Sequence, residues 1–184
     1  MRAAKLLCVL MTLLLGGGCA SGADTAADRI REHYAGKTEG TYTVTLRTDF
    51  GDRVLDFMVE YAYTPAGGRM KVLSPEPVAG IEAELEPGGV TLRYDGTVLE
   101  LGALPGTGLS PMESLPFIIA QWAGGYITQT GSETRTGQRL LTMTTLETQG
   151  ETALEARTWF DRDTLEPLTA ELLVNGALTV TAYF

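Results

Sequence analysis

The feature that most constrains the fold is a two-residue alternation of apolar and polar side chains, which begins near Thr41 and continues through most of the chain. It is clearest from Ile81 to Glu86, where apolar residues alternate with glutamates. In a strand this pattern places the apolar side chains on one face. About 9–11 such segments predict a mainly β (α+β) fold, built on a large, strongly curved antiparallel sheet with one apolar face.

Short turn signals separate these segments and predict hairpins between them. Asp95-Gly96 and Asn175-Gly176 are dipeptides preferred in two-residue type I′ turns. After the N-terminal segment, no linker or repeat divides the chain. Residues 28–184 are therefore predicted to form one domain.

One helix is expected to interrupt the strands. Ser110 is a capping residue, Pro111 suits the first helical position, and Glu113 completes a capping box. Gly124 ends the helix, and Pro116 lies early enough in it to be tolerated. An apolar stripe along one side of this helix is formed by Leu115, Ile118, Ile119 and Trp122.

The N-terminal segment has the pattern of a secretory signal. Arg2 and Lys5 precede an apolar run from Leu6 to Leu15, and three glycines then lead to Cys19. The run is too short to cross about 30 Å of hydrocarbon as a permanent helix. A cysteine directly after small residues resembles a bacterial lipoprotein signal. Residues 1–18 are thus predicted to be removed and Cys19 to be lipidated; the alternative is a secreted protein with one free thiol.

The next residues are small and polar. Residues 19–27 are expected to form a lipidated tether, in which Asp24 or Thr25 can cap a helix that runs to about Tyr34. Because Cys8 leaves with the signal, no disulfide is possible within the mature chain.

The charge of the chain excludes one class of partner. Without residues 1–18, the chain has 12 Lys plus Arg and 23 Asp plus Glu, a net charge of −11. Such a surface repels phosphate backbones, so nucleic acid is not an expected partner. Contact with a membrane is expected to come from the lipid anchor.

The chain offers few groups for catalysis. His33 is its only histidine and is expected on a helix surface, and no His/Cys cluster or glycine-rich phosphate loop is present. The glutamates of residues 82–86 are interpreted as the solvated face of a strand rather than a calcium site. Asp161 and Asp163 flank a turn and are expected to bond to its backbone amides. We therefore expect no enzyme, no metal and no cofactor.

The apolar residues favour a binding function instead. A bent sheet under a helical lid commonly leaves an apolar cavity, which is the default site for an apolar ligand. The alternative is that the same side chains fill the core and leave no usable space. The candidate cavity or lid residues are Leu115, Ile118, Ile119 and Trp122 on the helix, with Phe57, Tyr61 and Trp159 on strands.

The order of these elements resembles the superfamily of the lipoprotein carrier and receptor LolA and LolB, over residues 27–184. The resemblance rests on the N-terminal helix, the Asp95-Gly96 hairpin, the helix that starts at Ser110-Pro111, and the strand at residues 158–161 before the closing hairpin. It implies an eleven-stranded half-barrel covered by two or three helices, with a cavity for acyl chains. The lipoprotein signal makes the chain closest in character to LolA-like lipoproteins of Gram-positive bacteria, such as the spore germination lipoprotein GerS.

This resemblance implies two functions. The first is a lipoprotein anchored at the outer face of the cell membrane, which binds acyl chains, lipid or lipoprotein on its apolar concave face without catalysis. The alternative is a protein-binding adaptor of the germination type, which supports a cell-wall (cortex) amidase.

Overall fold

The computed structural model describes residues 21–86, 89–100 and 111–184. The predicted signal segment 1–18, the lipidation site Cys19 and the capping residue Ser110 lie outside the described residues. Within them, eleven strands form a single antiparallel sheet in the order β6-β5-β4-β3-β2-β1-β11-β10-β9-β8-β7. The strands are β1 (Gly40–Asp49), β2 (Val54–Thr64), β3 (Gly67–Ser74), β4 (Glu82–Glu86), β5 (Gly89–Tyr94), β6 (Thr97–Glu100), β7 (Tyr126–Arg135), β8 (Gln138–Gln149), β9 (Thr152–Asp161), β10 (Pro167–Val174) and β11 (Ala177–Tyr183).

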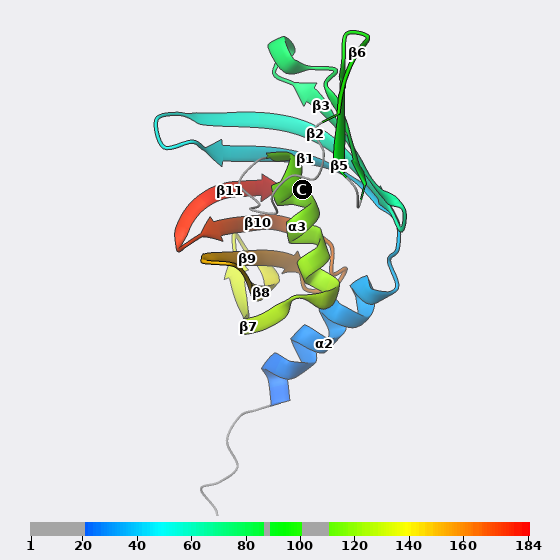
Figure 1. The fold of residues 1–184 in the computed structure, drawn as a ribbon. Helices are drawn as coiled ribbons and strands as arrows, with labels where there is room; N and C mark the ends of the chain where they lie inside the picture. The colour runs from blue at the N-terminus through cyan, green and yellow to red at the C-terminus, as the bar shows by residue number, and fades with distance from the viewer. Residues whose placement is uncertain (1–20, 87–88, 101–110) are drawn as a thin grey trace, which may run out of the picture.

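The sheet is open and strongly curved, as Figure 1 shows: β5 and β6 stand upright in this view, whereas β9, β10 and β11 lie across it. Consecutive strands pair with each other from β1 to β6 and from β7 to β11. The pairing of β1 with β11 joins these two halves into one sheet. The edge strands β6 and β7 do not pair with one another. The predicted curved antiparallel half-barrel is therefore confirmed.

Two α-helices, α2 (Ser21–Ala35) and α3 (Pro111–Gly124), pack against each other on the concave side of the sheet (Figure 1). A short 3-10 helix, η2 (Glu76–Val78), follows β3. Helix α2 begins at Ser21, before the expected cap at Asp24 or Thr25. The alanines of this segment are the strongest helix formers, and Ala26 and Ala27 are buried, so part of the expected tether belongs to the domain.

The core lies between the helices and the central strands. The predicted alternation is visible in β1, where Val44 and Leu46 are fully buried, and in β2, where Val59 and Tyr61 are buried between exposed residues. On α3, Leu115, Ile118 and Trp122 have no exposed surface. The apolar stripe predicted from the sequence is thus the side of α3 that contacts the core.

Candidate functional site

The contact between α3 and the sheet is solid rather than hollow. Trp122 is completely buried, and its ring centroid lies 4.9 Å from that of Tyr34, 5.6 Å from that of Phe160 and 5.5 Å from that of Phe184. Its indole Nε1 donates a hydrogen bond of 3.0 Å to Oγ1 of Thr158 on β9. No ligand can occupy this part of the concave face without displacing the core.

The candidate residues named from the sequence do not form one site. Leu115, Ile118 and Trp122 belong to this filled core. Phe57 is half-buried and packs against the edge of the core. Only two of the candidates, Ile119 and Tyr61, line an open groove.

Trp159 lies on the opposite face of the sheet. Its neighbours Thr158 and Phe160 both contact Trp122, and successive side chains of a strand point to opposite faces. The guanidinium of Arg135 stacks 4.5 Å from the centre of the Trp159 ring. Trp159 is therefore not part of the concave surface to which the sequence analysis assigned it.

Beside the filled core, a groove of about 400 Å³ runs between α3 and the strands β2, β3 and β4. Small and apolar side chains form most of its walls. Its lining residues from α3 are Pro116, Ile119, Ala120 and Ala123, and those from the strands include Tyr61, Tyr63, Gly68 and Leu85.

The groove exists because both of its walls carry small residues. Ala120 and Ala123 lie one turn apart on α3, and Gly68 on β3 has no side chain to fill the space. A Cβ atom at Gly68 would lie 2.6 Å from the ring of Tyr61, closer than carbon atoms approach. The absence of a side chain at Gly68 therefore lets the Tyr61 ring lie against β3, where it forms part of the groove wall.

The polar groups of the groove are mostly uncharged. Burial raises the pKa of Tyr61 to about 12, and it also raises the pKa of Tyr34, so both hydroxyls are protonated at neutral pH. The Tyr34 hydroxyl donates to the carbonyl oxygen of Leu165 at 2.7 Å. Lys37 and Glu86 bring one charge of each sign to the lining, and Lys37 Nζ lies 3.0 Å from a carboxylate oxygen of Glu166. Such a groove suits an apolar chain better than an ion.

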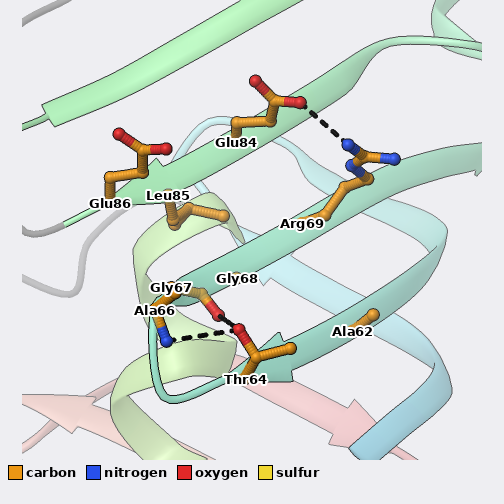
Figure 2. Close-up of a pocket in the computed structure, with 9 residues that line it drawn as sticks. All are labelled: Ala62, Thr64, Ala66, Gly67, Gly68, Arg69, Glu84, Leu85 and Glu86. Carbon is orange, nitrogen blue, oxygen red and sulfur yellow. Dashed lines mark hydrogen bonds and ion pairs between the residues drawn. The ribbon is translucent and has the colours of Figure 1, made fainter.

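A second hollow, of about 360 Å³, lies on the convex side of the same strands. Figure 2 shows that its wall carries an ion pair between Arg69 and Glu84, 2.9 Å apart. Arg93 binds the other carboxylate oxygen of Glu84 at 3.0 Å, and Lys71 pairs with Glu82. Of the glutamates interpreted as a solvated strand face, Glu82 and Glu84 thus form ion pairs across strands on the convex side. This hollow is the poorer candidate for an apolar ligand.

The structure also places the other titratable groups considered from the sequence. His33 Nε2 lies 3.9 Å from a carboxylate oxygen of Glu166. Asp161 accepts hydrogen bonds from the backbone N–H groups of Asp163 and Thr164, both at 2.8 Å, which confirms its predicted role in the turn.

Within residues 21–86, 89–100 and 111–184, no three His, Cys, Asp or Glu side chains are grouped to hold a metal ion. None of the helices in that same part of the chain is long and apolar enough to cross a membrane.

Comparison with known proteins gives a likeness in structure only. No protein-family model matches the chain, and no curated protein matches it. An uncharacterized conserved protein from Thermus thermophilus is similar with a TM-score of 0.50 and 11% identity, over 87% of this chain and 82% of that one.

Two further solved structures are similar at lower TM-scores. A LolA superfamily protein from Nitrosomonas europaea has a TM-score of 0.45 and 12% identity, over 83% of this chain and 74% of that one. The lipoprotein LppX from Mycobacterium tuberculosis has a TM-score of 0.47 and 14% identity, over 86% and 91%. Identities this low concern the fold alone. The structure itself confirms the predicted architecture: an open eleven-stranded antiparallel sheet with helices on its concave side.

Proposed function

We propose that this protein is an extracytoplasmic lipoprotein, held at the membrane by an acylated Cys19, that binds the acyl chain of a lipid or lipoprotein without catalysing a reaction. The observation that carries the proposal is the groove between α3 and β2–β4. Its volume of about 400 Å³ lies in the usual range for small-molecule sites, about 300–1,000 Å³.

The chemistry of the groove supports an acyl chain as the ligand. Ile119, Pro116 and Leu85 offer apolar contact, and the alanines of α3 leave room for a chain to lie along the helix. Removal of an acyl chain from water gains about 0.8 kcal/mol per buried CH₂ group. The protonated hydroxyl of Tyr61 can donate a hydrogen bond to the ester or carboxyl end of such a ligand.

The position of α2 supports the anchor. Its first turn begins at Ser21, two residues after Cys19, so an acyl group on Cys19 would hold the start of this helix close to the bilayer. In Figure 1 this end of α2 points away from the sheet. The groove would then remain accessible beside the membrane.

A variant that fills the groove tests the proposal. Ala120 is exposed and lines the groove, so Ala120→Phe is expected to block it without disturbing the core. The chain from Ser21 onward contains every described helix and strand and is suited to binding of a fluorescent fatty acid. We expect Ala120→Phe to abolish most of this binding, and the matched variant Ala177→Phe, on an exposed site of β11, to leave it unchanged.

Mass spectrometry of lipid that co-purifies with the chain gives a second readout. Bound acyl chains in the wild type, and their loss in Ala120→Phe, agree with the proposal. Equal binding by both proteins would contradict it. Reproducible absence of lipid, together with a protein partner recovered by pull-down, would favour the adaptor alternative.

A further inference from the structure

A cluster of arginines lies between α2 and the ends of β8 and β9, and it shares no lining residue with the groove. The guanidinium of Arg29 donates a hydrogen bond of 3.2 Å to the carbonyl oxygen of Arg162. The backbone N–H of Arg162 donates to the carbonyl oxygen of Arg139 at 3.2 Å. Three of the 12 basic residues that follow Cys19 thus meet at one place in a chain whose mature net charge is −11.

The strand register places one of these arginines, Arg139, on the concave face. Ser132 is paired with Leu141, and Leu141 is paired with Phe160, whose side chain is in the core. Arg139 lies two residues before Leu141, and Arg162 lies two residues after Phe160. Because side chains alternate along a strand, Arg139 extends from the concave side. Arg162 follows the end of β9 and lies beside Arg139, since its backbone N–H donates to the Arg139 carbonyl oxygen.

These side chains surround a pocket of about 240 Å³. Two hydroxyl groups complete its polar lining, because Thr134 is directly opposite Arg139 and Ser132 is two residues earlier on the same strand. The lining is formed by Ser132, Glu133, Thr134, Arg139 and Arg162.

Two of the nearby carboxylates are already engaged. Glu133 pairs with Arg135. The carboxylate of Asp161 accepts hydrogen bonds from Gln138 and from two backbone N–H groups of its own turn. No described carboxylate forms an ion pair with Arg139 or Arg162. Two like charges next to each other across paired strands are destabilising, and a bound anion removes this repulsion.

We propose that this pocket binds a phosphate group. A guanidinium presents its N–H donors as a planar fork that matches phosphate oxygens, and the lining of this pocket includes two arginines and two hydroxyl residues. A tetrahedral phosphate offers acceptors in several directions, whereas a carboxylate offers only two oxygens. The strongly acidic remainder of the molecule repels anions, so the attraction is local to the pocket. Free phosphate and the phosphate of a lipid headgroup present the same chemistry.

Thermal melts of the full-length protein in a nonionic detergent test this proposal, with inorganic phosphate or chloride added at equal ionic strength. Phosphate is expected to raise the melting temperature of the wild type. Arg139→Gln and Arg162→Gln are each expected to weaken phosphate binding about tenfold, since each removes charge-assisted hydrogen bonds. A separate melt with dihexanoylphosphatidylglycerol tests whether a lipid headgroup binds in the pocket.

Arg53→Gln is the matched control, because it removes the same charge from the turn between β1 and β2. It is expected to bind phosphate as the wild type does. If only the lipid raises the melting temperature, and Arg139→Gln and Arg162→Gln both lose this increase, the pocket binds a lipid headgroup. No response of the wild type to either probe, or an equal loss in Arg53→Gln, would overturn the proposal. Neither result bears on the groove, which Ala120→Phe tests separately.

Discussion

The indole of Trp122 donates a 3.0 Å hydrogen bond to Thr158 and so joins α3 to β9 at the centre of the concave face. The sequence analysis left two alternatives for this region, a packed core or a cavity. The contact shows that the region is a packed core. The groove proposed for the ligand lies to one side of this contact, beside β2–β4. Stability and binding are therefore expected to depend on different parts of the same helix.

Truncation of Trp122 tests this separation. Trp122→Ala is expected to lower the free energy of unfolding by about 3–5 kcal/mol, because it removes a fully buried aromatic side chain from a packed core. Thr158→Val leaves the indole N–H without its acceptor and is expected to cost about 1–3 kcal/mol. Urea unfolding measures both. A small loss in Trp122→Ala, together with altered fatty-acid binding, would instead place Trp122 at the rim of a cavity.

Gly68 allows a test of the groove from the strand side. In Gly68→Ala the added methyl group would overlap the Tyr61 ring, which is expected to turn into the groove and weaken fatty-acid binding. Gly124→Ala is the control, because a Cβ atom there meets no other atom within 4 Å. Fluorescence titration of both variants measures the difference. Equal affinity in Gly68→Ala and Gly124→Ala would show that Tyr61 does not border the ligand.

Asp161 is expected to make stability depend on pH. A hydrogen bond from the Thr164 backbone N–H, with others from Gln138 and Asp163, lowers the pKa of Asp161 from 3.8 to about 2. The charged form of this carboxylate is therefore more stable, relative to its protonated form, in the folded state than in the unfolded state. Its stabilising contribution is present above pH 3.8 and is lost as the pH falls toward 2.

Urea unfolding between pH 5 and 2 measures this effect. Asp161→Ala is expected to lose less stability over that interval than the wild type, because the titrating group is gone. Asp163→Ala serves as the control, since this substitution removes one charge from the same turn but leaves the Asp161 carboxylate in place. An identical pH dependence in all three proteins would contradict the assignment.

Lipidation can be tested with the two cysteines of the sequence. An alkyne analogue of palmitate is expected to label the wild type and Cys8→Ser but not Cys19→Ser, because only Cys19 becomes the N-terminal acceptor. Two acyl chains, at about 0.8 kcal/mol per buried CH₂, anchor a protein stably, whereas one chain is marginal. Detergent partitioning is expected to follow the labelling. Label on Cys19→Ser would place the modification elsewhere.

Local sequence patterns were sufficient to predict most of the fold. The alternation in β1 and β2 identifies Val44, Leu46 and Val59 as buried, because it depends only on the two-residue period of a strand. The stripe of Leu115, Ile118 and Trp122 identifies the buried side of α3 in the same way. These features are properties of single elements, and neighbouring residues are enough to specify them.

Only the tertiary structure decided the candidate site. In β9, Thr158, Trp159 and Phe160 follow one another without a clear alternation, so the face of Trp159 depends on the register against β8 and β10. The groove depends on the position of α3 relative to the sheet, which brings Ala120 and Gly68 into the same lining. The arginine pocket depends on the pairing of β7 with β8 and on the turn after β9. Residues far apart in the chain form each of these sites, because long-range pairing and packing, rather than local preference, set the distances between them.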